Sequence, residues 1–408
     1  MKTPRSNRMH IGIFGKRNAG KSSLINALTG QSHAIVSDTP GTTTDPVFKA
    51  MELSGVGPVV FIDTAGIDDE GQLGQLRIEK TRDILARTDL AILVIDGADM
   101  YFGQEGSWMQ RLKEAEIPTI TVINKWDIIN ETGHFLIAKE ATELANEYAM
   151  DAPIPISTVT GEGVEELRQA IRDKLQQEDI QETILGGLIE DGSLVLLVMP
   201  QDIQAPKGRL ILPQVQTIRE LLDRKCTVIS ATADGLAKAL DMLNRAPDLI
   251  ITDSQCFDEV YKQKPETSAL TSFSILMAAA KGDIEVFTEG VSAIDDALSR
   301  METEPFRVLI AEACTHVPLN EDIGTVKIPR LLHQAFGDRV SVTSVRGNDF
   351  PDAEDLKQYD LIIHCGACMF NRRHVMSRIA QAKAAGVPIT NYGVFLARMA
   401  GILDKVVK

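Results

Sequence analysis

The sequence predicts an α/β protein made of three consecutive α/β domains with mainly parallel sheets, the first of them built around a phosphate-binding loop. Two observations lead to this prediction. Runs of consecutive apolar residues, typical of parallel strands buried on both faces, alternate with segments of helical spacing. A glycine-rich loop at residues 15–23 separates the first apolar run from the first helical segment. We expect domains at residues 1–175, 185–300 and 301–408.

The composition limits the classes of function. The chain has 408 residues and a formal net charge of −15, which argues against a surface that coats nucleic acid, since phosphate neutralisation needs clustered Lys and Arg. Five cysteines are too few for a disulfide framework and favour a reduced cytoplasmic setting. We expect no secretory signal and no membrane-spanning helix, because no apolar run reaches about 18 residues.

The glycine-rich loop has the pattern of a phosphate-binding loop. It follows the apolar run Met9–Phe14 and precedes the helical segment Leu24–Leu28. Glycines permit turns that a Cβ would block, so that successive N–H groups point at an anion beside the helix N-terminus. Lys21 would reach the β- and γ-phosphates and the Ser22 hydroxyl would bind Mg²⁺. The expected nucleotide contacts in this loop are Gly15, Lys16, Arg17, Asn18, Ala19, Gly20, Lys21, Ser22 and Ser23.

The rest of the first domain alternates in the same way. Strands are expected at 59–62, 90–95 and 119–123, with helices at 75–86 and 104–115. In a doubly wound sheet of this kind, ligands bind at the carboxyl ends of the strands. We therefore searched those ends for further polar motifs.

Two segments at this edge are expected to contact Mg²⁺ and the γ-phosphate. Asp63 follows a strand and can orient Mg²⁺ through water, and the Gly66 N–H can sense the γ-phosphate. The loop 38–45 is rich in Pro, Gly and Thr and is expected to be mobile. We expect Thr43 of this loop to close onto Mg²⁺ when the γ-phosphate is present, although a plain surface loop is the alternative.

A third motif predicts which base is bound. Asn124, Lys125 and Asp127 follow the strand at 119–123. The Asp127 carboxylate only accepts hydrogen bonds, and guanine offers two N–H donors on one edge where adenine presents an acceptor. The site therefore favours GTP over ATP. Ser157 and Thr158, at one further strand end, would complete the base pocket.

With these motifs, the first domain resembles the GTPase subclass that includes the tRNA-modifying and ribosome-assembly GTPases. Residues 41–45 match that subclass except at Thr44, where Arg is usual. The resemblance implies a P-loop GTPase fold whose intrinsic GTP hydrolysis is slow or needs another group, because Ile67 stands where Ras-like enzymes place a water-orienting Gln. Asn18 matches the residue that helps hold K⁺ in potassium-activated members, so we expect K⁺ to stimulate hydrolysis.

The middle of the chain carries no chemical motif. We expect strands at 193–200, 226–230 and 248–252 and helices at 236–243 and 271–282. Cys226 is expected in the core and Cys256 in a loop or at the start of a helix. Self-association is our hypothesis for this domain.

The last domain places cysteines after two strands. Cys314 and His316 follow the predicted strand 306–312, whereas His364, Cys365 and Cys368 follow the strand 359–363 and precede a helix at 372–385. In a parallel sheet both loops emerge at the same edge, so three thiolates and two imidazoles would meet there. The nearby helix N-terminus would lower the thiol pKa values of Cys365 and Cys368.

The ligand types leave three alternatives open. Three Cys with a His suit a structural Zn²⁺, a lone Cys-x-x-Cys can be a redox dithiol, and three Cys can hold an iron–sulfur cluster with one open position. An electron-transfer protein would usually need four secure ligands, and no dinucleotide-binding motif follows a strand. An RNA-linked GTPase would need a basic appended domain, which this acidic chain lacks.

Both sites together resemble one family. A Cys-x-His motif, a spacer and a His-Cys-x-x-Cys motif behind a GTPase domain are similar to the FeFe-hydrogenase maturation GTPases of the HydF family. The resemblance implies a 4Fe–4S cluster on Cys314, Cys365 and Cys368 with an exchangeable fourth position, and makes His316 and His364 candidate ligands or hydrogen-bond donors. It also implies a homodimer formed through the middle domain. The implied role is a scaffold that receives a two-iron precursor made with two radical-SAM maturases and delivers it to apo FeFe-hydrogenase.

Overall fold

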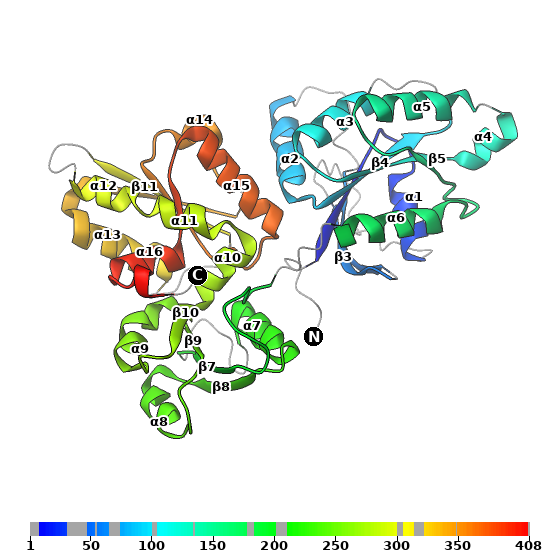
Figure 1. The fold of residues 1–408 in the computed structure, drawn as a ribbon. Coiled ribbons are helices and arrows are strands. Elements are labelled where there is room, and N and C mark those ends of the chain that lie inside the picture. Colours follow the sequence, from blue (N-terminus) through cyan, green and yellow to red (C-terminus); the bar gives the residue numbers. More distant parts are fainter. Residues whose placement is uncertain are drawn as a thin grey trace. The chain divides into compact units, whose positions relative to one another are not determined.

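The structure is a computed structural model that describes residues 8–30, 47–53, 55–64, 74–99, 104–133, 135–177, 183–200, 210–299, 305–313, 322–347 and 349–406. Two compact units divide the chain, at residues 1–180 and 181–408 (Figure 1). Each unit is an α/β structure, and each is described on its own below.

The first unit contains one six-stranded sheet with the strand order β2-β3-β1-β4-β5-β6. All neighbouring strands are parallel except β2, which pairs antiparallel with β3 at the edge. The strands are β1 (Met9–Phe14), β2 (Val47–Leu53), β3 (Gly57–Asp63), β4 (Leu90–Asp96), β5 (Thr119–Asn124) and β6 (Ile154–Pro155). The helices are α1 (Lys21–Thr29), α2 (Gly74–Arg87), α3 (Glu105–Glu114), α4 (Trp126–Thr132), α5 (Leu136–Glu147) and α6 (Val164–Gln177).

Helices cover both faces of this sheet, which explains why its central strands are apolar without alternation. Helices α1 and α6 lie on one face, and α3 and α5 lie on the other (Figure 1). All seven residues of β4 are buried. The carboxyl ends of β1, β3, β4 and β5 thus form one edge at which the predicted nucleotide residues emerge.

The second unit contains two four-stranded sheets, both wholly parallel, with the orders β10-β9-β7-β8 and β12-β11-β13-β14. The strands are β7 (Leu194–Val198), β8 (Thr227–Ala231), β9 (Leu249–Thr252), β10 (Ala269–Ser272), β11 (Phe306–Glu312), β12 (Val340–Arg346), β13 (Leu361–His364) and β14 (Ile389–Asn391). The helices are α7 (Leu212–Asp223), α8 (Leu236–Asp241), α9 (Phe257–Gln263), α10 (Phe273–Lys281), α11 (Ile284–Gly290), α12 (Ala293–Ser299), α13 (Ile328–Phe336), α14 (Ala353–Leu356), α15 (Arg372–Ala385) and α16 (Tyr392–Met399).

One hydrophobic cluster joins these two sheets. It contains Leu196 and Ile250 from the second sheet together with Val308 and Ile363 from the third. Helix α10 contributes to this cluster through Ile275 and packs against α15 and α16. This shared core is the physical reason that the two sheets form one compact unit.

The predicted fold class is confirmed, since three mainly parallel sheets follow one another along the chain. Three predicted elements, β1, β11 and α15, begin and end at the expected residues. The prediction of a helix over 271–282 is wrong at its start, because Thr271 and Ser272 end strand β10 and the helix begins at Phe273. Ser272 caps this helix by accepting from the Ile275 N–H, which fixes the boundary.

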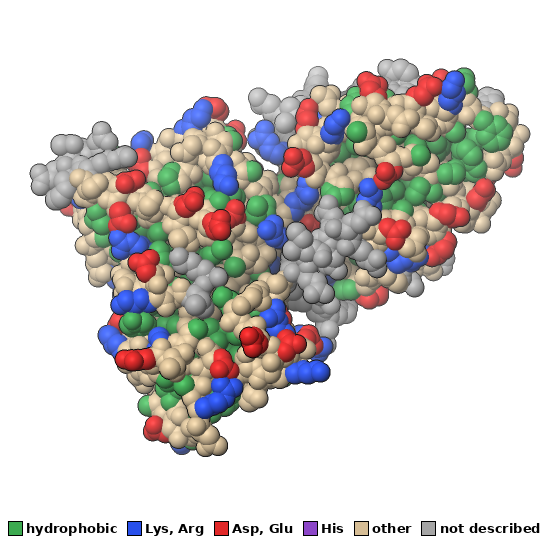
Figure 2. All heavy atoms as spheres, in the orientation of Figure 1, with side chains coloured by type: hydrophobic (Ala, Val, Ile, Leu, Met, Phe, Trp, Pro, Cys, Tyr) green, Lys and Arg blue, Asp and Glu red, His purple; other side chains and the backbone are tan. Residues whose placement is uncertain are grey.

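The described residues include no helix that combines the length and apolarity needed to cross a membrane. On the face drawn in Figure 2, Lys and Arg side chains are interspersed with Asp and Glu on both units. Cys226 is buried, as expected for a core residue, and Cys256 ends a short 3₁₀ turn directly before α9.

Candidate nucleotide and cysteine sites

The glycine-rich loop joins β1 to α1 as predicted. Gly15 has a φ of +131°, and a Cβ there would lie 2.2 Å from the Val94 carbonyl oxygen, so only glycine fits. Lys21 is buried, and its ammonium group donates to the carbonyl oxygens of Gly15 and Lys16, 3.0 Å away in the second case. The lysine therefore folds back over the loop, at the position from which it would contact a bound phosphate.

Asn124 forms hydrogen bonds both with this loop and with the segment that contains Thr158. Its Nδ2 donates to the Ala19 carbonyl oxygen at 2.8 Å, and its Oδ1 accepts from the Thr158 N–H at 3.3 Å. Gly20 lies so close that a Cβ would approach Asn124 Nδ2 to 2.2 Å. Asn124 thus connects its own motif by hydrogen bonds to the phosphate loop and to the segment that contains Thr158.

Asp127, which is predicted to recognise guanine, and Lys125 of the same motif are held in place by their neighbours. The Ser157 hydroxyl donates to Asp127 Oδ1 at 2.6 Å. Lys125 adopts a left-handed φ of 62°, and its ammonium group lies 2.7 Å from Asp96 Oδ2. Asp96 ends β4 and is buried, and it is not among the predicted site residues because no recognisable motif surrounds it in the sequence. The structure brings Asn124, Lys125, Asp127, Ser157 and Thr158 together.

Ser22 and Asp63 are brought together at the phosphate end of the site. Ser22 Oγ donates to Asp63 Oδ2 at 3.0 Å, and Lys49 Nζ lies 3.7 Å from the same carboxylate oxygen. A hydroxyl beside a buried carboxylate is a donor set that Mg²⁺ prefers, so these residues fit the expected ion. Thr43 and Gly66, the other two residues predicted to act here, lie outside the described residues.

A buried carboxylate that the sequence did not reveal lies beside the loop. Lys16 Nζ is 2.7 Å from Asp99 Oδ2 and 3.6 Å from Glu105 Oε1. Glu105, at the start of α3, is 1% exposed, and burial raises its pKa although Lys16 opposes the shift. Lys16 is thereby held toward α3, whereas its neighbours Arg17, Asn18 and Ser23 are exposed.

The cysteine loops begin at neighbouring strands. Strands β11 and β13 pair in parallel, with Ala311 opposite His364. The Ala313 N–H donates to Cys365 Sγ at 3.0 Å, and the Ala367 N–H donates to the same sulfur at 3.4 Å. Cys314 and His316, which follow Ala313, lie outside the described residues. Among the residues that the structure does describe, no group of three or more His, Cys, Asp or Glu side chains could hold a metal ion.

The predicted lowering of the thiol pKa is wrong for Cys365. Burial raises the pKa of this thiol to about 11, and the two backbone N–H donors oppose that shift only in part. Desolvation of the thiolate therefore outweighs any effect of the following helix, whose first residue, Arg372, lies seven positions further on.

His364 lies in the interior with both ring nitrogens occupied. Its Nδ1 lies 2.8 Å from the Cys365 carbonyl oxygen, and its Nε2 lies 3.1 Å from Arg378 Nη1. The side chain is fully buried, and burial together with the Arg378 charge lowers its pKa to about 3. The ring is accordingly neutral and turned toward the backbone of the cysteine loop.

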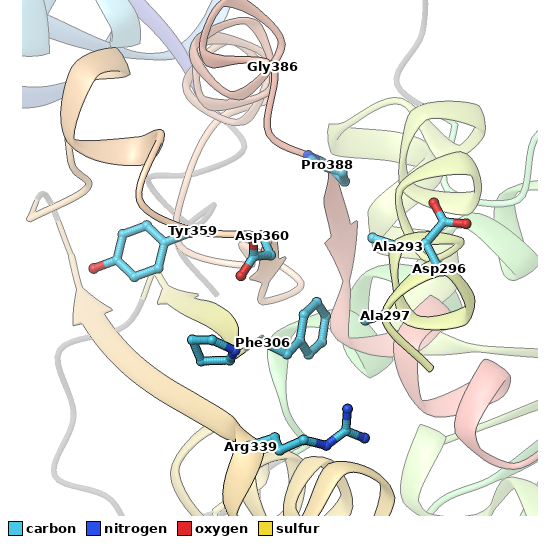
Figure 3. Close-up of a pocket in the computed structure, with 10 residues that line it drawn as sticks. Ala293, Asp296, Ala297, Phe306, Arg339, Tyr359, Asp360, Gly386 and Pro388 are labelled. Atoms are coloured by element: carbon cyan, nitrogen blue, oxygen red, sulfur yellow. The ribbon is translucent and has the colours of Figure 1, made fainter. Parts of the chain in front are cut away.

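A cavity of about 310 Å³ lies at the opposite edge of the third sheet. Phe306, Asp360 and Pro388, which line it, stand at the amino ends of β11, β13 and β14 (Figure 3). Because the strands are parallel, this cavity and the cysteine loops occupy opposite ends of the sheet. It is therefore no part of the cysteine site.

The strand order, phosphate loop and base-binding residues define the first unit as a P-loop GTPase domain. The family model described as "50S ribosome-binding GTPase" matches residues 10–125. The "Hydrogen maturase F dimerization domain" matches residues 184–282, and the "Hydrogen maturase F tetramerization domain" matches residues 285–408. These two models together span more than half of the chain, which belongs to the hydrogen maturase F family.

Relatives found by sequence comparison include several GTPases. The tRNA modification GTPase MnmE of Heliobacterium modesticaldum is 31% identical over 242 residues, which are 59% of this chain and 45% of that protein. GTPase Der of Chloroflexus aurantiacus is 37% identical over 166 residues, 39% of this chain and 36% of that protein. The chain spans less than half the length of these relatives.

Solved GTPase structures align with part of the chain. The G domain of the T. maritima FeoB iron transporter is 28% identical and covers 42% of this chain and all of that chain, with a TM-score of 0.31. Era of Aquifex aeolicus is 20% identical and covers 55% of this chain and 92% of that chain, with a TM-score of 0.34. The assignment of the first unit as a P-loop GTPase domain therefore rests on its strand order and phosphate loop, and not on these structural alignments.

Proposed function

We propose that this chain is a GTP-hydrolysing scaffold that binds a 4Fe–4S cluster and carries a two-iron precursor to apo FeFe-hydrogenase. Cys314, Cys365 and Cys368 are the proposed cluster ligands. The cluster would supply one iron whose fourth coordination position is exchangeable, so that a second inorganic fragment can attach. The partners are the hydrogenase and two radical-SAM maturases. GTP hydrolysis would modulate the docking or release of these partners through the loop that contains Thr43.

One observation carries the cluster proposal: the hydrogen bond of 3.0 Å from the Ala313 N–H to Cys365 Sγ. Ala313 immediately precedes Cys314, so this bond joins the beginning of one cysteine loop to the sulfur of the other. N–H donors to sulfur stabilise the anionic sulfur of a cluster ligand, and Cys365 Sγ accepts two of them. These two contacts support Cys365 as a ligand of an iron–sulfur cluster.

His364 is proposed to orient Cys365 rather than to bind iron. Its two ring nitrogens are engaged by Arg378 and by the Cys365 carbonyl oxygen, and a ligating nitrogen would have to give up one of these bonds. His316 stays a candidate ligand or donor. The domain limits 1–175, 185–300 and 301–408, and a homodimer formed through the middle domain, stay predictions. The matched dimerization and tetramerization domains support self-association.

The GTPase part of the proposal assigns roles to residues of the first unit. Lys21 would neutralise the β- and γ-phosphates, Ser22 and Asp63 would hold Mg²⁺, and Asp127 would accept from guanine. A potassium ion held with the help of Asn18 would add positive charge at the phosphates. We expect faster GTP hydrolysis in K⁺ than in Na⁺ buffer at equal ionic strength, and equal rates would exclude the potassium site.

Purification without oxygen tests the cluster. Wild-type protein is expected to contain iron and to give an electron paramagnetic resonance signal after reduction. Cys365→Ser and Cys368→Ser should lower the iron content by more than about tenfold, because a cluster needs its thiolates. Hydrolysis of GTP should be unchanged in both variants, because the cysteines and the nucleotide residues belong to different compact units.

Cys256→Ser is the matched control, since Cys256 lies in the same unit and follows β9 of the other sheet. This variant should keep the iron and the resonance signal of the wild type. Zinc in place of iron in the wild-type protein would overturn the carrier role. Retention of iron in Cys365→Ser and Cys368→Ser would show that other residues bind it.

A further inference from the structure

We propose that Arg378 is a positioning residue for the cysteine site, which it orients through His364 and through the aromatic ring of Phe370. This inference rests on the proposed cluster-binding function. Arg378 lies on α15, fourteen positions after His364 in the sequence, and its side chain is only 2% exposed. Its side chain contacts residues on both sides of the Cys-x-x-Cys segment.

The first contact sets the hydrogen-bonding state of His364. A guanidinium group can only donate, so Arg378 Nη1 donates and His364 Nε2 must accept at 3.1 Å. The ring hydrogen is then on Nδ1, which donates to the Cys365 carbonyl oxygen at 2.8 Å. Without the arginine, His364 could rotate or change tautomer, and that carbonyl oxygen would lose a donor.

The second contact reaches the residues that follow Cys368. The guanidinium carbon lies 4.7 Å from the ring centroid of Phe370 and 4.7 Å from that of Phe350, so it is sandwiched between two aromatic faces. Phe370 is itself fixed, because its N–H donates to the Ala367 carbonyl oxygen and its ring stacks on His374 at 4.0 Å. Arg378 therefore contacts both ends of the Cys-x-x-Cys loop. It bonds His364 before the loop and packs against Phe370 after it.

The third contact connects Arg378 to the ends of strands β12 and β11. Arg378 Nη2 donates to the Gly347 carbonyl oxygen, and the Gly347 N–H donates to the Glu312 carbonyl oxygen at 2.8 Å. Glu312 ends β11, directly before the segment that leads to Cys314. One side chain thus connects the carboxyl ends of β12, β11 and β13, from which the cysteine loops emerge.

These contacts explain why an arginine is buried at this position. Lysine carries its donors on a single nitrogen, so it would lose the fixed spacing of the two guanidinium donors and the planar stacking on both rings. Cys365 is meanwhile fixed at both ends, because Asn391 Nδ2 also donates to its carbonyl oxygen at 3.2 Å and two N–H groups donate to its sulfur. A ligand that is oriented before it binds loses less entropy on binding.

The test compares Arg378→Lys with Arg330→Lys, a matched substitution at an exposed position on α13 of the same unit. Nitrogen-15 NMR of the histidine rings in the iron-free full chain reports the tautomer of His364, assigned with His364→Gln. The wild type and Arg330→Lys should show hydrogen on Nδ1 alone. Arg378→Lys should show a mixture of tautomers, while its rate of GTP hydrolysis stays at the wild-type value.

After anaerobic reconstitution with iron and sulfide, Arg378→Lys should hold at least about twofold less iron and give a broadened resonance signal, because misplaced ligands weaken metal binding. Phe350→Leu removes one aromatic face but no hydrogen bond, so it should keep the wild-type tautomer. Arg378→Gln replaces Arg378→Lys if the lysine variant shows no cooperative melting.

An unchanged tautomer together with an unchanged resonance signal in the Arg378 variant would overturn the proposal. A wild-type protein that binds no iron would refute the cluster-binding function instead, and the NMR comparison would still decide whether Arg378 orients His364. The two failures are therefore distinguishable.

Discussion

Asp127→Asn is expected to convert the nucleotide site from one that binds GTP into one that binds XTP. The Asp127 carboxylate can accept from both N–H donors of guanine, whereas the asparagine amide would set its NH₂ group against the guanine amino group. Xanthine has a carbonyl oxygen in place of that amino group and can accept from the amide. A binding site that leaves one hydrogen-bonding group unpaired loses affinity by at least about 100-fold, so GDP binding should fall by that factor.

The neighbour that holds Asp127 in place can hold an asparagine there in the same way. The Ser157 hydroxyl, 2.6 Å from Asp127 Oδ1, can donate to an amide oxygen as it does to a carboxylate. Calorimetric titration with GDP and XDP, followed by hydrolysis assays with GTP and XTP, gives the change in specificity. Asp151→Asn is the matched control, because Asp151 is 74% exposed and pairs with Lys174 at the surface. Unchanged GDP affinity in Asp127→Asn would exclude Asp127 as the base-recognition residue.

The nucleotide site was largely predictable because its information is local. The glycines of the loop, Lys21 and Ser22 occupy fixed positions within nine residues, and each later motif follows a continuous apolar run that could be assigned as a strand. Parallel strands then bring these motifs to one edge without any knowledge of side-chain contacts. The adjacency of β11 and β13 follows the same reasoning.

The remaining features depend on contacts between distant residues. Glu105 is an unremarkable helical glutamate in the sequence, and only the packing of α3 beside the phosphate loop buries it near Lys16. The pKa of Cys365 was predicted in the wrong direction because the helix N-terminus is visible in the sequence, whereas desolvation is a property of the folded chain. Arg378 was missed for the same reason, since nothing in α15 distinguishes a buried arginine from an exposed one.

The helix boundary at Ser272 shows how propensity can mislead. The segment Thr271–Gly282 is rich in Ala, Leu and Met, which predicts one continuous helix. Residues Ala269–Ser272 instead pair with Leu249–Thr252 at the edge of the second sheet. The last two residues of this strand, Thr271 and Ser272, have little helical preference of their own, because Thr is β-branched and Ser favours the N-cap position.

Gly290→Val is expected to destabilise the second unit strongly. Gly290 ends α11, and a Cβ there would lie 2.0 Å from the Ile389 carbonyl oxygen and 2.6 Å from its carbonyl carbon. Both atoms belong to the backbone of β14, so no rotamer change can relieve the contact. Helix α11 would have to move away from the sheet.

That movement would break further interactions. Phe287 is 1% exposed in the shared core, and its carbonyl oxygen accepts from Thr390 Oγ1 at 2.7 Å. Overpacking alone costs about 1–3 kcal/mol, and partial exposure of Phe287 adds to it. We expect a loss of at least about 3 kcal/mol, which lowers the melting temperature of a unit of this size by about 6–12 °C.

Scanning calorimetry of the full chain, with GTP hydrolysis measured in parallel, provides the test. Gly187→Val is the matched control, because Gly187 is exposed and a Cβ there meets no atom within 4 Å. The transition of the second unit should shift only in Gly290→Val, while the hydrolysis rate stays constant because the nucleotide residues lie in the other compact unit. If Gly290→Val and Gly187→Val melt at the same temperature, the close approach of α11 to β14 does not stabilise the second unit.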